Sequence, residues 1–275
     1  MIDKRDLPDF RTPPAIETLM GFYFAPMKGW QTPYFGLFWN EIRKNYPRVE
    51  VQPFLVPEQG LRLELKSEKS RLELSGEVPV RWMYFHDSGK TLIQIQSDSF
   101  IQNWRKRSDK DPYLHFGDLR PSFASMWDRY SRFLRANKVQ APAVRECEVT
   151  YVNHIDKGAG WSSLRDLGNV VSCWSGATSG NFLPAPDLIS LNVVYPIRKT
   201  GGRLQVTLQP GIREGQETLQ LTLMAKCKPE SSTTVELMNA LDIAREWVVR
   251  GFTDFTTGNM HKIWERIERK GRGRK

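Results

Sequence analysis

The feature that most constrains the fold is an alternating segment in the middle of the chain, residues 145–155 (RECEVTYVNHI). Its two sides differ in polarity: one carries Cys147, Val149, Tyr151 and Ile155, and the other carries Glu146, Glu148, Thr150 and His154. A period of two is the pattern of a β-strand that is covered on one face. We therefore expect a central strand that closes the first half of the protein and connects it to the second.

The segments before this strand predict the rest of the first half. Strands are expected at 15–25, 81–86 and 91–96, helices at 34–46 and 121–137, and an inserted charged hairpin at 61–74. Both helices carry apolar residues at i, i+3, i+4 and i+7, which is the pattern of packing against a core. Without the inserted hairpin the order is βαββαβ, the ferredoxin-like arrangement with helices on one face of an antiparallel sheet.

The second half is expected to be a three-stranded meander followed by a long C-terminal helix. Alternating leucines and valines mark the strands, and Thr233 to Glu236 form a capping box that begins the helix. Between the halves lies an irregular segment that contains Trp161 and Trp174. The expected organisation is α+β, and its parts are residues 1–157, the linker or loop 158–187, the meander and helices at 188–268, and a disordered basic tail at 269–275.

Composition describes a globular protein of 275 residues, 40% of them hydrophobic. No run of about 18 apolar residues is present, and the first residues lack the apolar core of a signal peptide, so a cytoplasmic location without membrane association is expected. The three cysteines are widely spaced and form no CxxC, which favours reduced thiols over disulfides or a zinc site.

The net charge of +9 would suggest nucleic-acid binding, but the excess positive charge is concentrated at one end of the chain. Residues 262–275 hold seven Lys/Arg and two Glu, an excess of five, which leaves about +4 for the rest of the chain. The charge therefore points to one short end of the protein and not to a basic groove.

No catalytic or metal-binding motif is present. The four histidines form no HxxxH or HxH pair, and GxSxG, GxxxxGK[ST] and a GxGxxG after a strand are all missing. Glu146 and Glu148 share one strand face, but neighbouring positions on one strand do not converge on a substrate. We expect no metal and no cofactor.

Four blocks of sequence together carry a resemblance: PPAIE (13–17), LIQIQSDSFIQNWRK (92–106), TYVNHI (150–155) and FTDFTTGNMHKIW (252–264). They resemble a sporadically distributed, uncharacterised family of bacterial proteins, and they extend over nearly the whole chain. The resemblance implies a bacterial cytosolic protein of an accessory gene set, such as phage defence or a toxin–antitoxin-like system. It implies no activity. The family leads us to expect a His early in the last helix, where this chain has Ala244 and Arg245.

Three hypotheses about function remain open. The first is a non-enzymatic binding or adaptor protein. Its partner would be another protein, encoded by a neighbouring gene. The oligomeric state is left open. Its candidate surface comprises Glu17, Arg81, Gln94, Gln96, Asn153, His154, Trp161 and Trp174. For Glu17 itself, exposure to solvent at the sheet end is favoured over pairing with an arginine, and the two tryptophans either stack on a ligand or pin their loop to the core.

The second hypothesis is a nucleic-acid-associated protein that contacts phosphates through clustered basic residues. These residues are Arg105, Lys106, Arg107, Arg269, Lys270, Arg272, Arg274 and Lys275. The sequence itself favours a solvated loop for 105–107. The third hypothesis is an enzyme whose site combines distant residues such as Glu17, Arg81, Asn153 and His154.

Overall fold

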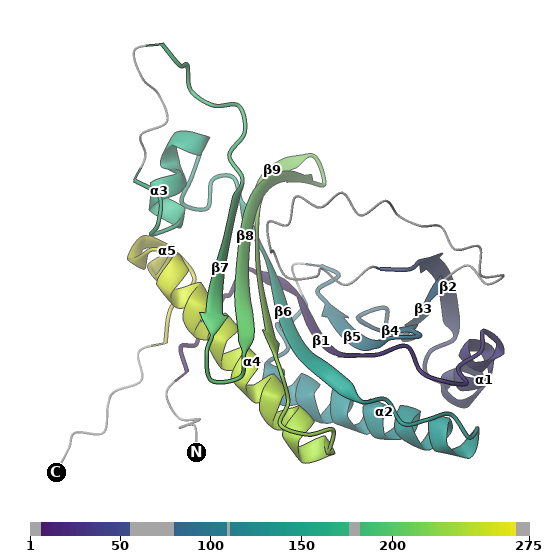
Figure 1. Cartoon of the computed structure of the whole chain (residues 1–275). Coiled ribbons are helices and arrows are strands. Elements are labelled where there is room, and N and C mark those ends of the chain that lie inside the picture. Colours follow the sequence, from purple (N-terminus) through teal and green to yellow (C-terminus); the bar gives the residue numbers. More distant parts are fainter. Residues whose placement is uncertain (1–6, 56–79, 109–110, 176–181, 268–275) are drawn as a thin grey trace.

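The computed structural model describes residues 7–55, 80–108, 111–175 and 182–267. The predicted hairpin at 61–74 and the basic tail at 269–275 lie outside these residues. The fold is α+β, and in the described parts nine antiparallel strands form one sheet in the order β2-β3-β4-β5-β1-β6-β9-β8-β7. The two halves of the chain therefore share a single sheet (Figure 1).

The elements follow one another along the chain as strands β1 to β9 and helices α1 to α5. The strands are β1 (Ala15–Phe24), β2 (Arg48–Pro53), β3 (Val80–Phe85), β4 (Thr91–Gln96), β5 (Ser99–Arg105), β6 (Val144–Asp156), β7 (Leu191–Ile197), β8 (Gly202–Arg213) and β9 (Gln216–Cys227). The helices are α1 (Pro33–Ile42), α2 (Phe116–Ala136), α3 (Leu167–Val170), α4 (Thr234–Phe255) and α5 (Gly258–Ile263).

Two halves with the same connectivity build the sheet. In the first, β1 is followed by the meander β2 to β5, the last meander strand pairs with β1, and the long helix α2 follows. In the second, β6 is followed by the meander β7 to β9, the last meander strand pairs with β6, and the long helix α4 follows. β1 and β6 pair antiparallel at the centre, so the halves meet along their first strands.

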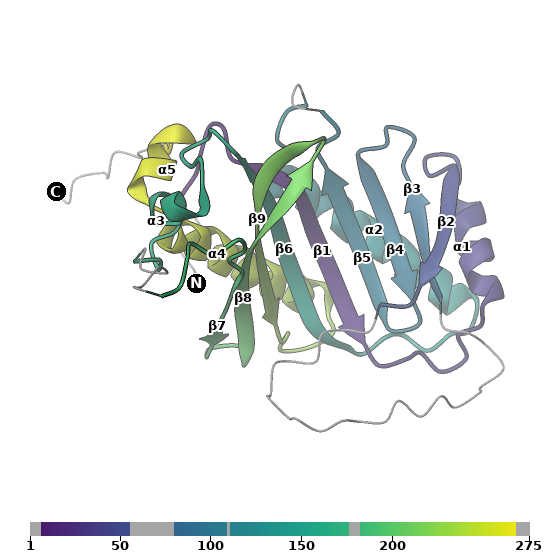
Figure 2. The same ribbon diagram turned by 90° about the horizontal axis from the view of Figure 1, so that it is seen from above.

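The sheet is strongly curved, and α2 and α4 lie along its convex face, whereas the concave face is turned away from them (Figures 1 and 2). Aromatic packing fixes α2, because the ring of Phe22 on β1 lies 4.8 Å from that of Phe123 and 4.9 Å from that of Trp127. α4 packs on β6 and β9. Gly251 allows a close approach there, since a Cβ at this position would lie 2.5 Å from Cδ2 of Leu204.

The central strand is confirmed, because β6 pairs with both β1 and β9 and buries Cys147, Val149 and Ile155 towards the helices. The two strands predicted at 81–86 and 91–96 are confirmed as the hairpin β3–β4. The start of α2 differs from the prediction: the helix begins at Phe116, and Pro121 lies inside it. The structure also contains two strands that the predicted βαββαβ order lacks, β2 and β5.

The start of α4 confirms one half of the predicted capping box: Thr233 is the N-cap, but its backbone N–H donates to Oγ of Ser231 and not to Glu236. The side-chain oxygen of Thr233 accepts a hydrogen bond of 3.4 Å from the backbone N–H of Glu236. This contact satisfies one of the N–H groups that a helix start leaves without a partner inside the helix. Gly251 lies inside the continuous helix Thr234–Phe255.

Candidate binding site on the concave sheet face

The concave face of the sheet is the candidate site, and strand register decides which residues reach it. Register pairs Glu17 with Arg105, Leu92 with Asn103, and Glu148 with Lys226, so these side chains share one face. The helices contact the opposite face through residues such as Phe22 and Phe100. The polar members of the concave face include Glu17, Arg81, Gln94, Gln96, Asn103, Arg105, Glu146, Glu148, Thr150, His154, Gln220, Thr222 and Lys226.

A continuous hydrogen-bonded chain crosses four strands of this face, and we call it the Arg81–Glu17 network. Nη1 of Arg81 donates to Oε1 of Gln94 (2.9 Å), and Nε2 of Gln94 donates to Oδ1 of Asn103 (2.7 Å). Nδ2 of Asn103 donates to Oε1 of Glu17 (2.5 Å), whose other oxygen accepts from Nε of Arg105 (3.1 Å). Gln94 and Asn103 are buried, so the network holds its side chains in fixed positions.

The expectation that Glu17 faces water is wrong. Its side chain is only 16% exposed and forms an ion pair with Arg105. Arg105 is the last residue of β5 and not part of a solvated loop. The physical reason is register, which places these two residues opposite each other on β1 and β5. The carboxylate of Glu17 therefore interacts with the guanidinium of Arg105 and not with water.

A second group, the Glu148–Lys226 cluster, lies on β6 and β9. Nζ of Lys226 is 3.4 Å from Oε2 of Glu148 and 3.9 Å from Oε2 of Glu146, and Oγ1 of Thr150 donates to Oε1 of Glu148 (2.8 Å). The ammonium also lies 4.4 Å from the centre of the Tyr23 ring, a cation–π contact. Burial raises the pKa of Tyr23, and the neighbouring Glu148 raises it further.

His154 and its neighbours continue the polar surface along β6 and β9. Nε2 of His154 lies 3.3 Å from Oε1 of Gln220, and Nε2 of Gln220 lies 3.5 Å from Oγ1 of Thr222. Nδ1 of His154 is buried without a hydrogen-bond partner, and so is Nε of Arg81. Burial lowers the pKa of Arg81. Buried polar atoms without partners are costly.

Five of the eight residues proposed from sequence lie on this face, and three lie elsewhere. Glu17, Arg81, Gln94, Gln96 and His154 share it. Asn153 points to the other side of the sheet, is 2% exposed and donates to the carbonyl oxygen of Leu221 (3.0 Å). Trp161 is buried and donates to the carbonyl oxygen of Ile155 (3.0 Å), and Trp174 packs against the core.

Sequence reasoning missed Asn103 and Lys226 as members of the site. Asn103 is part of β5, whose residues are buried on both faces, so the strand shows no alternation that would assign it a side. Lys226 continues the alternation that places Gln220 and Thr222 on one face of β9. Continuing the same alternation from Thr222 through Met224 to residue 226 would have included Lys226.

Exposed apolar side chains lie near the hairpin end of β8, where register places Ile212 in the same row as Leu204 and Leu208, on the side of the sheet that faces the helices. Leu188 and Ile212 are 66% and 79% exposed and line a groove of about 440 Å³ together with Trp161 and Leu164. Phe182 and Leu183, on the segment that leads to this groove, are 94% and 62% exposed. Clustered exposed apolar residues mark surfaces that contact other molecules.

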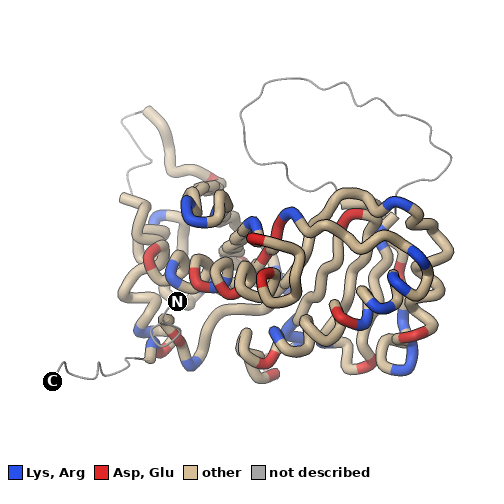
Figure 3. The backbone as a smooth tube through the Cα atoms, turned by 60° about the horizontal axis from the view of Figure 1, so that its bottom comes forward, with Lys and Arg blue, Asp and Glu red and all other residues tan. Residues whose placement is uncertain are grey.

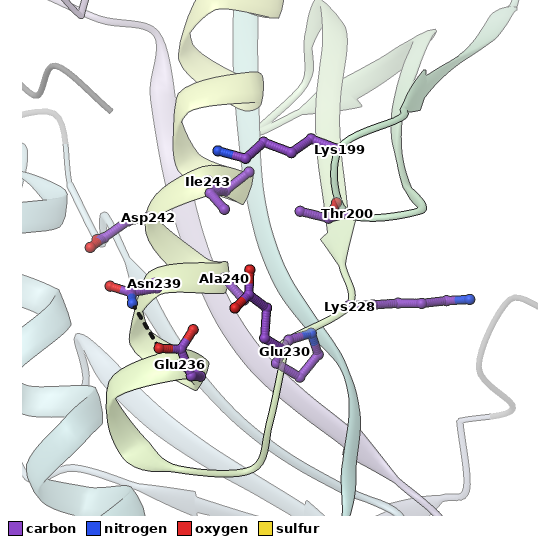
Figure 4. A pocket seen from close by; sticks show the side chains of 10 residues that line it. Lys199, Thr200, Lys228, Glu230, Glu236, Asn239, Ala240, Asp242 and Ile243 are labelled. Atoms are coloured by element: carbon purple, nitrogen blue, oxygen red, sulfur yellow. Dashed lines mark hydrogen bonds between the residues drawn. The ribbon is translucent and has the colours of Figure 1, made fainter. Parts of the chain in front are cut away.

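A groove of about 700 Å³ lies between α4 and the turn after β7 (Figure 4). Lys199 reaches towards α4, while Lys228 points away from it. Asp242 is oriented away from the groove and forms a two-point ion pair with Arg120 (2.8 and 3.1 Å). The charged groups of this groove do not converge, so it is a weaker candidate than the concave face.

Other types of site find no support in the described residues. No three or more His, Cys, Asp or Glu side chains gather there in a way that could hold a metal ion. Positive and negative residues are interspersed over the described backbone (Figure 3). No helix in these ranges is both long and apolar enough to span a bilayer.

Comparison of the chain with family models, with curated proteins and with solved structures found no match.

Proposed function

We propose that this protein is a non-enzymatic binding module that holds a segment of a partner protein on its concave sheet face. The observation that carries the proposal is the Arg81–Glu17 network, which fixes polar side chains in place on a face that no described helix contacts. Preorganised polar groups lower the entropic cost of binding. From the family resemblance, we infer that the partner belongs to the same bacterial accessory system, such as phage defence or a toxin–antitoxin-like pair.

Charge pairing favours a protein partner over nucleic acid. On the concave face, Arg105 pairs with Glu17 and Lys226 pairs with Glu148. Nucleic-acid surfaces depend on cations that are available to phosphates, and here two of the cations, Arg105 and Lys226, are paired with neighbouring carboxylates. The amides Gln94 and Asn103 and the imidazole of His154 can both donate and accept hydrogen bonds, which suits a polypeptide.

An enzymatic role for Glu17, Arg81, Asn153 and His154 is less well supported. Asn153 lies on the other side of the sheet from the remaining three, and Glu17 already accepts two hydrogen bonds. A general base must be within reach of the proton that it removes, and a carboxylate held by Asn103 and Arg105 has little freedom to do so.

Site-specific photo-crosslinking in cells that carry the native gene tests the proposal. A photoreactive residue at Thr222, on the concave face, is expected to capture one discrete protein. The same residue at Arg132, which is exposed on α2, is expected not to capture it. Equal capture at both positions, or a crosslinked product that nuclease degrades and protease does not, would overturn the proposal; the nuclease-sensitive product would support the nucleic-acid alternative.

A matched pair of charge deletions then tests the network. Arg81→Ala should weaken binding of the captured partner at least tenfold, because it removes the end of the network that has an unpartnered Nε. Arg132→Ala removes the same charge from the other side of the molecule and should leave binding unchanged. Circular dichroism and thermal unfolding of both variants separate loss of binding from loss of fold.

A further inference from the structure

A small cavity lies on the opposite side of the sheet from the concave face. It has a volume of about 50 Å³ and is enclosed by the N-terminal segment, the start of α2, the middle of α4 and the central strands. Phe10, Phe116, Val249 and Phe252 form its apolar walls, and Tyr151 and Arg245 bring polar groups to it. Its size admits a small molecule and excludes a nucleotide or a drug-sized ligand.

Arg245 lines this cavity and keeps an unsatisfied donor there. Its guanidinium carbon lies 5.1 Å from the centre of the Phe116 ring, and its Nε is buried without a hydrogen-bond partner. A guanidinium has five donors and no acceptor group, so this N–H group needs an acceptor. The carboxylate of Asp9 lines the same cavity.

Tyr151 brings a second polar group to the cavity. Its hydroxyl group interacts with the side chains of Tyr113 and Arg245. A tyrosine hydroxyl can both donate and accept a hydrogen bond. Burial raises the pKa of Tyr151 more than these two neighbours lower it, and burial also raises the pKa of Tyr113, so both hydroxyl groups keep their protons at neutral pH.

The remaining polar groups at the cavity are already engaged or also favour an anion. The carboxylate of Asp9 accepts the backbone N–H of Phe10 (3.0 Å) and has a further interaction. Asn153 donates to Leu221. His115 is the residue before α2, a helix of 21 residues, and its side chain does not cap that helix. The partial positive charge of this helix start favours a nearby negative group.

We propose that the cavity binds a small monocarboxylate, with the carboxylate held by Arg245 and Tyr151 and the alkyl group against Phe10 and Phe252. Nε of Arg245 lacks an acceptor among the described residues, the hydroxyl group of Tyr151 can donate a hydrogen bond, and a carboxylate provides two acceptor oxygens in a geometry that suits a guanidinium. A single cation and apolar walls fit a monocarboxylate better than a phosphate dianion. The site is independent of the concave face, so failure of one proposal does not affect the other.

Titration of the full-length protein with ¹³C-labelled acetate, followed by NMR and by thermal unfolding, tests this inference. Sodium acetate replaces sodium chloride at constant ionic strength, so that screening does not change. Saturable line broadening and a rise in melting temperature are expected with acetate and propionate. Benzoate, which exceeds the cavity, should have no effect.

Two variants locate the site. Tyr151→Phe removes one hydroxyl group and little else, and Arg245→Met keeps the apolar stem and removes the charge; each should weaken acetate binding at least tenfold. If Arg245→Met does not fold, Tyr151→Phe alone decides. Linear, non-saturable shifts, equal effects of chloride, or wild-type acetate affinity in Tyr151→Phe would overturn the inference.

Discussion

Glu148 and Lys226 face each other on β6 and β9 with 3.4 Å between Oε2 and Nζ, and their side chains are only 5% and 4% exposed. Removing one partner leaves a buried charge, which typically costs about 3 to 5 kcal/mol. Lys226→Met should therefore lower the free energy of unfolding in urea by this amount. Replacing both groups, as in Glu148→Gln with Lys226→Met, should recover much of the loss. Equal stability of the single and double variants would contradict this account.

Two glycines should respond to alanine in opposite directions. A Cβ on Gly202 would lie 2.0 Å from the carbonyl oxygen of Lys226, whereas a Cβ on Gly36, inside α1, would meet nothing within 4 Å. Gly202→Ala should destabilise by about 3 kcal/mol or more, at the upper end for overpacking. Gly36→Ala should stabilise by about 0.5 to 1 kcal/mol because it reduces the backbone freedom of the unfolded chain. Urea unfolding of both variants checks the contrast.

The three thiols should separate by reactivity. Cys147 and Cys227 are buried, and burial raises the pKa of each, whereas Cys173 is exposed. Reactivity needs the thiolate and access. A chromogenic disulfide reagent at pH 8 should therefore titrate one thiol in the native protein and three in guanidinium chloride. Cys173→Ser should abolish the native reaction, and a remaining fast-reacting thiol in this variant would refute the assignment.

Stability should fall at alkaline pH through buried tyrosines. Burial is the main cause that raises the pKa of Tyr46 to about 12, so the unfolded chain loses this proton near pH 10 and the folded protein does not. A raised folded-state pKa means that the stabilisation is complete below pH 10 and is lost as pH rises towards 12, by at most about 2 to 3 kcal/mol. Tyr46→Phe removes this proton.

Unfolding free energies of wild type and Tyr46→Phe at pH 8, 9.5 and 11 measure the effect. The difference between the two proteins should be constant up to pH 9.5 and should shift in favour of the phenylalanine variant at pH 11. Parallel curves over the whole range would assign the alkaline sensitivity to other groups. Tyr84 is one such group, because burial raises its pKa as well.

Sequence periodicity predicted those elements that face two different environments. β6 alternates because one of its faces packs against helices and the other forms the concave face, and α2 carries a clear apolar stripe. β5 was missed because six of its seven residues are buried, so burial on both faces removes the alternation. β2 was missed because it is a short edge strand, and none of its six residues is buried.

The candidate site could be predicted only in part, because its geometry depends on register between strands that are distant in sequence. Glu17, Arg81 and Gln94 were selected for their polarity on otherwise apolar strands, and the structure joins them through Asn103. Asn153 was included in the candidate surface for its polarity, but the alternation of β6 puts it on the same side as Cys147 and Ile155, where its amide donates to the backbone of β9. Side-chain chemistry alone does not distinguish these cases.

The meeting of the two halves along β1 and β6 has a consequence for synthesis on the ribosome. The outermost pairs of this seam, Phe24 with Val144 and Ala15 with Asn153, join residues 120 and 138 positions apart. Such distant pairing is slow because a long loop must close first. While residues 25–143 emerge, one edge of β1 has no neighbouring strand. The nascent chain therefore has to keep an unpaired apolar strand from aggregating until its last partner leaves the exit tunnel.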